Sequence, residues 1–361
     1  MLADPAKLER DLVDARSRAV RVTADIDGER LLGPKLAIVN PPLWEIGHVA
    51  WFQEHWCLRW RADGTRGDSI LAGADALYDS SAVAHDTRWD LPLPDLRATR
   101  KYGDDVLARV RERLAREPES RFLQYFVRLA TFHEDMHAEA FHYTRQTLGY
   151  AEPYHQSEVV LSPGKEMEME GGKFNIGAKP SDGFVFDNEK WAHEIDVAPF
   201  RIASAPVTNA QYLAYVRDGG KPPRYWKEEG GTWLLRRFDC WIPVPPDEPV
   251  RHVDWNEAQG YCAWAKRRLP TEAEWEFAAA AGKIGPAGVW EWTSSTFGPY
   301  PGFVADPYKE YSQPWFGDHM VLRGGSFAAP ERLLRTTFRN FYQPHRGDVF
   351  CGFRTCANGK E

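Results

Sequence analysis

Apolar residues recur at three- and four-residue spacing from residue 6 to about residue 150, which is the spacing of one face of an α-helix. Turn-rich pieces interrupt this pattern, with NPP at 40–42 and LPLPD at 91–95. We predict four main helices, near residues 6–31, 42–61, 97–115 and 120–147. Helices of this length with modest connections are typical of a four-helix bundle.

The pattern changes after AEPYHQ, so we expect a domain boundary near residues 155–163. From about residue 160 onward, short apolar strands alternate with glycine turns such as GGKF, DGGK and EGGT. The only convincing helices lie near 208–217 and 256–266, with a candidate third after Pro270. This half of the chain predicts an irregular α+β domain.

The composition narrows the function. With 361 residues, two domains are the natural expectation. The amphipathic N-terminus differs from a signal peptide, and no run approaches the roughly 18 apolar residues of a membrane span. We therefore expect a soluble, cytoplasmic protein. The net charge of -7, without a basic stripe, argues against a nucleic-acid partner.

The motif HEDMH places His133 and His137 one helical turn apart on the same face, where both imidazoles can hold one metal ion. The motif also fits the HExxH zinc-protease pattern, with Glu134 as the general base. Three neutral imidazoles suit zinc, copper or iron, so ligand type alone leaves the metal open.

A third ligand is needed, and His48 in LWEIGHVAWFQEHW is our choice because it lies close to the apolar seam of its predicted helix. Periodicity leaves four rivals open, which are Glu54, His55, Glu139 and His142.

Six motifs of the second half occur in a fixed order: GGKFNIGA (171–178), PFRIASAPVTNAQYLAYV (199–216), VDWNEAQGYCAWAKRRLPTEAEWEFAAA (253–280), VWEWTSS (289–295), VLRGGSF (321–327) and GFRT (352–355). The set resembles the formylglycine-generating-enzyme or sulfatase-modifying-factor domain, a C-type-lectin-like fold. LWEIGH and FHEDMHAEAF in the first half resemble the DinB-type four-helix domain that precedes this module in ergothioneine and ovothiol sulfoxide synthases, a family that includes selenoneine synthases. The resemblance implies a bundle over residues 1–158 that carries the metal ligands, and a formylglycine-generating-enzyme-like domain over residues 159–361.

The same resemblance implies the chemistry. It maps the ligands of an iron(II) site at the domain interface onto His48, His133 and His137. O2 is the oxidant, and a C–S or C–Se bond forms on the imidazole ring of hercynine, the trimethylated histidine betaine. Three neutral ligands leave up to three positions on an octahedral iron for a thiolate or selenolate, O2 and the imidazole.

Further site residues also follow from the resemblance. A tyrosine of the second domain acts as proton donor in the family and falls on Tyr308, with Tyr311 as the alternative. Arg88 falls where the synthases place an arginine that pairs with the carboxylate of the sulfur donor. Asn340 aligns with an asparagine that contacts the imidazole.

The quaternary ammonium of hercynine should lie among aromatic rings or near a carboxylate. Phe341, Tyr342 and the tryptophan-rich VWEWT segment are the candidates for this contact.

The chain departs from mycobacterial sulfoxide synthases at the same site. Met136 replaces a glutamine before the last ligand, and Phe341 and Tyr342 replace a Trp-Asp pair that helps bind a dipeptide donor. The loop AGKIGPAG is also short, for which we have no physical account. LWEIGHVAWFQE and FHEDMHAEA look similar to the selenoneine-synthase branch. A selenosugar donor is therefore slightly favoured over a cysteine-type thiol.

Three other functions compete with this interpretation. A formylglycine-generating oxidase shares the second domain, but the copper-binding cysteine pair of that family begins upstream of Cys351 and Cys356, in a stretch that here reads RTTFRNFY. A zinc hydrolase would use Glu134 beside the metal. A non-catalytic lectin-like binding module leaves the histidines without a role.

The five cysteines are odd in number and widely spread, which predicts mostly buried thiols without a disulfide framework.

Overall fold

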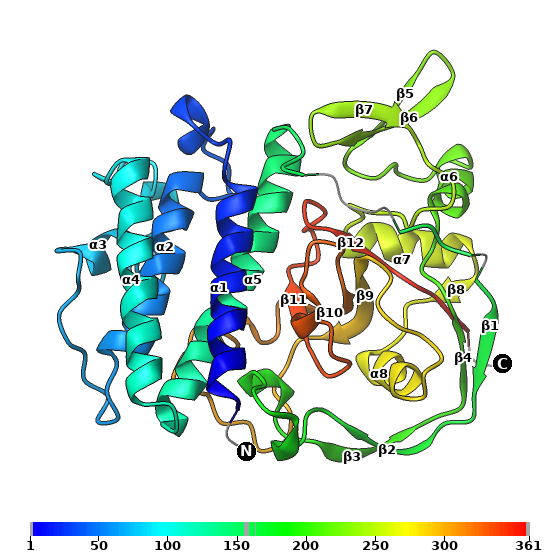
Figure 1. The fold of residues 1–361 in the computed structure, drawn as a ribbon. Helices are drawn as coiled ribbons and strands as arrows, with labels where there is room; N and C mark the ends of the chain where they lie inside the picture. The colour runs from blue at the N-terminus through cyan, green and yellow to red at the C-terminus, as the bar shows by residue number, and fades with distance from the viewer. Residues whose placement is uncertain (1–2, 155–158, 163, 359–361) are drawn as a thin grey trace. The chain divides into compact units, whose positions relative to one another are not determined.

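The computed structural model describes residues 3–154, 159–162 and 164–358. The chain forms two compact units, Met1–Tyr154 and His155–Glu361. The first is helical and the second mixes helices with small sheets (Figure 1), which confirms the predicted α+β class. The expected domain boundary between residues 158 and 159 borders the stretch 155–158, which lies outside the described residues.

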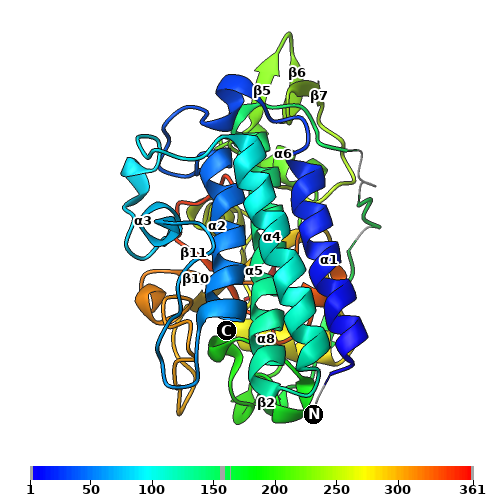
Figure 2. The same ribbon diagram turned by 60° about the vertical axis from the view of Figure 1, so that its left-hand side comes forward.

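The first unit is a four-helix bundle. Its long helices are α1 (Pro5–Val22), α2 (Pro42–Glu54), α4 (Leu96–Arg116) and α5 (Arg121–Leu148). Around the bundle, α1 packs on α5, α5 on α2, α2 on α4, and α4 on α1. Figure 2 shows the four helices side by side. The short helix α3 (Ala74–Tyr78) packs against α2.

Two of the predicted helices end earlier than the pattern suggested. The helix expected over residues 6–31 stops at Val22, because Thr23 caps it and the chain turns through Gly28 at a φ of +52° into a 3-10 turn, Gly28–Leu31. The helix expected over residues 42–61 is α-helical only to Glu54, and a π-helical turn follows at His55–Arg59. The other two helices match their predicted ranges to within a residue.

Within its described residues, the second unit contains four small sheets. One has the strand order β1 (Glu166–Met169), β4 (Phe200–Ala203), β13 (Cys356–Ala357) and β8 (Arg267–Arg268). Another has the order β11 (Asn340–Tyr342), β10 (Met320–Gly325), β9 (Val289–Thr296) and β12 (Cys351–Gly352). The others are the pair β2 (Gly172–Ile176) and β3 (His193–Val197), and the meander β5 (Trp226–Glu229), β6 (Thr232–Arg237) and β7 (Cys240–Pro243).

Three helices accompany these sheets, α6 (Asn209–Arg217), α7 (Trp255–Trp264) and α8 (Glu272–Ala280), where the sequence predicted them. Each begins with a capping box, in which a Thr or Asp side chain and the Gln or Glu three residues later satisfy each other's backbone N–H groups. Local sequence therefore determines where each helix begins.

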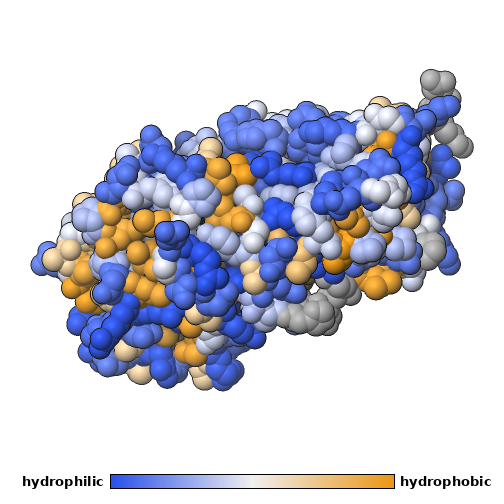
Figure 3. Space-filling view, turned by 90° about the horizontal axis from the view of Figure 1, so that it is seen from above, coloured by the Kyte–Doolittle hydropathy of each residue, from blue (hydrophilic) through white to orange (hydrophobic). Residues whose placement is uncertain are grey.

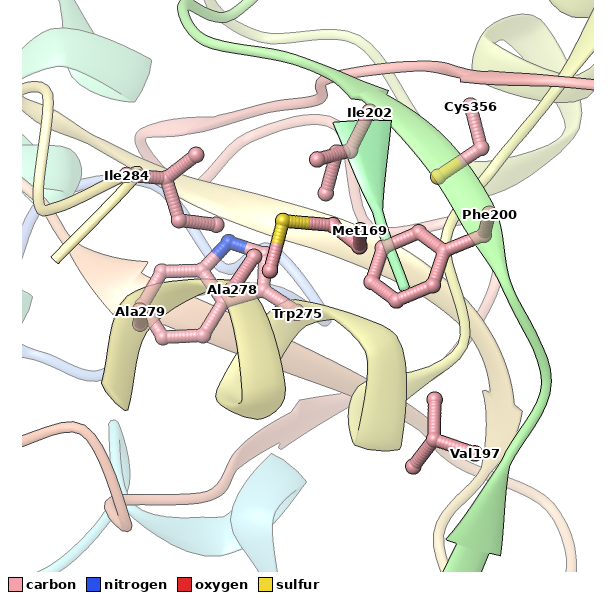
Figure 4. Close-up of a cluster of buried hydrophobic side chains, with 9 residues drawn as sticks. All are labelled: Met169, Val197, Phe200, Ile202, Trp275, Ala278, Ala279, Ile284 and Cys356. Carbon is pink, nitrogen blue, oxygen red and sulfur yellow. The ribbon is translucent and has the colours of Figure 1, made fainter. Parts of the chain in front are cut away.

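The core of the second unit lies where α8 packs against the sheets. Figure 4 shows its buried side chains, with Trp275 of α8 facing Met169 and the strand carrying Ile202. Trp275 also donates its indole N–H to Glu291, a carboxylate on β9 that is ion-paired with the fully buried Arg354. A buried charge is tolerated only with such partners.

The described residues contain no helix long and apolar enough to cross a membrane. On the face drawn in Figure 3, hydrophobic and hydrophilic residues are interspersed. None of the five cysteines is in a disulfide, and all except Cys240 are buried, as the sequence predicted.

Candidate metal centre

Three histidine side chains meet between α2 and α5 of the first unit. His48 comes from the middle of α2, and His133 and His137 come from adjacent turns of α5. Every residue of α2 except Ile46 is buried, so the helix presents His48 to the interior and not to solvent. Helix α5 is long enough, at 28 residues, to carry both other histidines well away from its ends.

The imidazoles are close enough to bind one ion. Ligand nitrogens of His48, His133 and His137 lie within 4.8 Å of one another. Among the described residues, these three side chains are the group of histidine, cysteine or acidic residues that could hold a metal ion. The ring centroids are 5.1 Å apart between His48 and His133, 5.0 Å between His48 and His137, and 4.4 Å between His133 and His137. The three side chains are thus compatible with a single metal ion.

Hydrogen bonds orient two of the three rings. His48 Nδ1 lies 2.8 Å from the carbonyl oxygen of Tyr78, and His137 Nδ1 lies 2.6 Å from the carboxylate of Glu45. Both oxygens only accept, so each Nδ1 carries the proton and each Nε2 keeps its lone pair for a metal. This outer bonding is typical of metal-bound histidines.

Stacked aromatic rings restrict the rotation of the His133 and His48 side chains. His133 stacks on Phe52 with centroids 3.5 Å apart and an interplanar angle of 3°, and His48 stacks on Trp44 at 4.8 Å and 10°.

Burial, followed by the neighbouring imidazole of His137, holds the pKa of His48 and of His133 well below the usual value. Neutral imidazoles are the form that binds a metal, so the donor set fits a divalent ion.

The four rival side chains lie elsewhere in the bundle or are otherwise engaged. Glu54 accepts hydrogen bonds from Ser69, from the Ile70 N–H and from the Tyr102 hydroxyl. His55 packs among tryptophans, and burial lowers its pKa to about 4. None of the four joins the cluster of ligand nitrogens formed by the described residues.

His142 donates Nδ1 to the Ala138 carbonyl within its own helix, and Glu139 is buried on the same helix.

Glu134 is engaged in an ion pair inside the bundle. The residue is 1% exposed, and Arg16 of α1 donates Nε to Oε1 of its carboxylate at 2.5 Å. Arg16 also donates to the Gly103 carbonyl and to Gln53. Glu134 therefore forms a buried ion pair between α1 and α5, which argues against the zinc-hydrolase alternative.

Arg88 is buried beside the histidine cluster. Its guanidinium lies 3.9 Å over the Trp44 ring, whose other neighbour is His48, and it donates to Asn40 and to the Val83 carbonyl. Burial lowers the pKa of Arg88 to about 10. Within the described residues no carboxylate forms an ion pair with Arg88, and its Nε has no hydrogen-bond partner.

Both predicted tyrosines lie in the second unit, on the loop before β10. Tyr311 stacks on Phe186 at 4.1 Å and meets Phe341 edge to face at 5.7 Å, and the Tyr308 ring lies 6.0 Å from that of Tyr311. Burial, followed by the charge of Glu189, raises the pKa of Tyr311 well above its usual value. This phenol therefore keeps its proton at neutral pH.

The other predicted contacts lie on β11. Phe341 stacks on Phe297 at 4.1 Å, Tyr342 lies under the Arg346 guanidinium at 5.2 Å, and the Asn340 side chain accepts the Phe341 N–H. All three side chains of β11 are half-buried. The structure thus brings Tyr308, Tyr311 and Phe341 into one aromatic group.

The VWEWT segment belongs to the buried core of the second unit and not to a ligand pocket. Trp290 and Trp292 on β9 are fully buried, and Trp292 donates its indole N–H to the Val253 carbonyl. These two rings are therefore not accessible to a quaternary ammonium. Cys351 and Cys356 are also fully buried and belong to different sheets, so they do not form a cysteine pair for copper.

Glu45, Tyr78 and Trp44 each contact a histidine of the cluster, and none of the three is among the site residues predicted from the sequence. Glu45 could have been found, because a carboxylate in the otherwise apolar LWEIGHVAWF run of a buried helix requires a partner. Tyr78 acts through its backbone carbonyl, which no side-chain pattern reveals.

Two family models match the chain. A model of the DinB superfamily matches residues 11–141, and one of the sulfatase-modifying factor enzyme 1-like domain matches residues 153–288 and 284–359. The first covers the bundle with its histidine cluster, and the second covers most of the mixed unit.

Curated relatives extend this result over the whole chain. The chain is 34% identical to the hercynine oxygenase of Mycolicibacterium thermoresistibile, over 97% of this chain and 94% of that protein. It is 29% identical to ergothioneine biosynthesis protein 1 of Schizosaccharomyces pombe, over 48% of this chain and 28% of that protein. The formylglycine-generating enzyme of Streptomyces coelicolor is 27% identical over 54% of this chain and 88% of that protein.

Proposed function

This chain belongs to the hercynine oxygenase family and is an oxygenase, and on that premise we propose that it forms a C–S or C–Se bond at C2 of the imidazole ring of hercynine with O2 as oxidant. One observation carries the proposal: the cluster of His48, His133 and His137 lies in the DinB-like unit of a chain that aligns with these oxygenases nearly end to end.

We propose iron(II) as the metal, held by Nε2 of His48, Nε2 of His137 and a ring nitrogen of His133. When bound, iron supplies the one-electron and O2 chemistry that no side chain can perform, and three protein ligands leave positions for substrates. The chain's own part is to hold the three imidazoles in fixed orientations, with His48 and His133 buried and neutral.

The overall reaction balances with a donor written R–SH or R–SeH. The C2–H bond of hercynine and the S–H or Se–H bond break, and a C–S or C–Se bond forms. One oxygen atom of O2 goes to the sulfur or selenium, and the other leaves as water with the two hydrogens. Tyr308, with Tyr311 as the alternative, is proposed to hold or move a proton in this process, because a phenol is protonated at neutral pH and can donate to a reacting oxygen.

We propose that Arg88 binds a substrate carboxylate. A buried guanidinium without an ion-pair partner in the described part of the chain favours an anion, and its Nε–H is left to donate. A cysteine-type donor would bring that carboxylate. A selenosugar has none, and in that case the carboxylate of hercynine is the anion for Arg88.

Asn340, Phe341 and Tyr342 are proposed to bind the organic substrates. Asn340 can donate to or accept from an imidazole, and the aromatic faces of Phe341 and Tyr342 suit the trimethylammonium group. In the sequence these two residues replace the Trp-Asp pair of the mycobacterial synthases, whose aspartate helps bind a dipeptide donor, and this supports a selenosugar over γ-glutamylcysteine. A cysteine-type thiol is the second candidate.

The donor is tested by incubating the Fe(II)-loaded protein with hercynine and ¹⁸O2 and, in separate reactions, with a selenosugar, cysteine or γ-glutamylcysteine. Mass spectrometry should detect an adduct of hercynine with the selenosugar that carries one ¹⁸O atom. A labelled adduct formed only with cysteine would reverse the donor preference, and a labelled γ-glutamylcysteine adduct would refute the argument from Phe341 and Tyr342.

A further inference from the structure

Glu45 is a buried carboxylate one helical turn before His48. Its side chain is 1% exposed, and its Oε1 lies 2.6 Å from Nδ1 of His137. The two residues are 92 positions apart in the chain and belong to facing helices, α2 and α5. Burial of a carboxylate is unfavourable unless a hydrogen-bond partner replaces the lost water, and Nδ1 of His137 is such a partner for Glu45.

The contact has a direct effect on His137. Because a carboxylate can only accept, it fixes the proton on Nδ1 and directs the Nε2 lone pair away from Glu45. A negative charge at hydrogen-bond distance also increases the electron density of the ring, which makes Nε2 a stronger ligand. His48 is held in the same way, but by the neutral carbonyl of Tyr78.

The surroundings explain why a charged acceptor is useful here. A divalent ion bound by three neutral imidazoles would leave its full charge in the interior, and Arg88 adds a second buried positive charge beside Trp44. The Glu45 carboxylate is in contact with the cluster, and its charge favours the protonated form of Arg88. It thus offsets part of the positive charge that the loaded site would contain.

We infer that Glu45 is a positioning residue of the metal centre: its carboxylate orients His137 and strengthens that histidine as a ligand. This inference rests on the proposed metal site, but it concerns the affinity for the metal and not the identity of the substrates. Adjacent residues of one helical turn then support two ligands, since Trp44 stacks on His48 and Glu45 binds His137.

The test is metal affinity. Dissociation constants for Fe(II), and for Co(II) as a spectroscopic probe, are measured by chelator competition under anaerobic conditions for the wild type, Glu45→Gln and Glu45→Ala. Gln keeps an acceptor without the charge, whereas Ala removes both. We expect about a 10-fold loss of affinity for Glu45→Gln and up to about 100-fold for Glu45→Ala, with a changed Co(II) absorption spectrum in the latter.

The matched control is Glu54→Gln, which neutralises another buried carboxylate of α2 whose partners are Ser69, Ile70 and Tyr102. It should bind metal within about 3-fold of the wild type, because its contacts lie outside the cluster. Glu45→Gln is nearly isosteric and is the deciding variant if Glu45→Ala does not fold. Wild-type affinity in Glu45→Gln, or an equal loss in Glu54→Gln, would overturn the inference. Failure of the wild type to bind metal would instead overturn the proposed function.

Discussion

At the scale of single residues, the centre depends on which ring nitrogen of each histidine is committed to the protein. Nδ1 of His48 and Nδ1 of His137 each donate to a fixed oxygen, so their Nε2 atoms are the ones that remain for a metal. The stacking of His133 on Phe52 holds the third ring in place. These contacts preorganise the ligands before any ion binds, which lowers the cost of binding.

Removal of a ligand should abolish metal binding. In His133→Ala or His137→Ala, two imidazoles remain, and we expect the iron content to fall from about one atom per chain to below about 0.1, because a chelate of three neutral ligands becomes one of two. His142→Gln is the control, since His142 is a buried histidine of the same helix that donates to Ala138. Metal analysis after anaerobic loading measures all three variants, and full occupancy in either alanine variant would refute the site assignment.

The sequence predicts these residues unequally. Spacing alone places His133 and His137 on one face of a helix, and their rings lie 4.4 Å apart in the structure. His48 was one of several candidates until the ordered motifs of the second half indicated the family. Glu45 and Tyr78 could not be assigned as partners, because each contact joins segments distant in the chain, and periodicity carries no information on which helices face each other.

At the scale of elements, α2 carries His48 and packs against two other helices that shape the candidate centre. One is α5, which carries His133 and His137, and the other is α3, whose Tyr78 carbonyl orients His48. Gly47 permits the close approach of α3, since a Cβ at that position would lie 2.3 Å from the Tyr78 ring. Glycine is unfavourable in the interior of a helix, and the close packing against Tyr78 explains why α2 has one at position 47.

Gly47→Ala should therefore damage both stability and the centre. The clash with the buried Tyr78 ring is severe and should cost about 3 kcal/mol, and the better helix propensity of alanine returns about 1 kcal/mol, so we expect a net loss of about 2 kcal/mol in the free energy of unfolding. Gly285→Ala is the control, because nothing lies within 4 Å of its Cβ position. Urea titrations compare the two variants. An unchanged or increased stability in Gly47→Ala would contradict this packing account.

Two helices end before the residues that the hydrophobic pattern predicts. The amphipathic pattern continued past Val22, but Asp25, Asp27 and Gly28 favour turns, and the helix ends there. At His55, α2 changes to a π-helical turn, which no hydrophobic pattern announces. Such turns occur often at functional sites, and this one follows directly on the helix that carries His48.

At the scale of the whole molecule, five of the histidines that the structure describes are buried and have depressed pKa values. Burial is the first cause in each, and it lowers the pKa of His55 and His142 to about 4 and that of His252 to about 3, while those of His48 and His133 lie well below the usual value. Histidines of an unfolded chain titrate near a pKa of about 6.5. Below that pH the unfolded chain binds protons that the folded protein does not.

The metal-free protein should therefore lose stability as the pH falls from about 6.5 toward about 4, and this contribution should be fully present above pH 6.5. Each such histidine adds about 1.4 kcal/mol per pH unit to the slope. Urea unfolding between pH 7.5 and 5 measures the slope, and His142→Gln should reduce it by about that amount. A free energy of unfolding that stays constant over this range would contradict the assignment of these imidazoles as neutral.

The two-part organisation was largely predictable, because helical periodicity and ordered motifs are local signals that repeat along many residues. The α+β class is confirmed, and α6, α7 and α8 begin at capping boxes that are visible in the sequence. The role of VWEWT was not predictable in this way. Tryptophans suit both a core and an ammonium pocket, and only their full burial on β9 separates the two.

The most direct test of the central claim is the O2-dependent consumption of hercynine by the iron-loaded protein. Anaerobic protein with one equivalent of Fe(II) is mixed with hercynine and a selenosugar or thiol donor, O2 is admitted, and the remaining hercynine is measured by mass spectrometry. We predict that hercynine disappears only when iron, O2 and a donor are all present, and that His137→Ala consumes none. Hercynine that persists in the complete mixture with every donor would contradict the account.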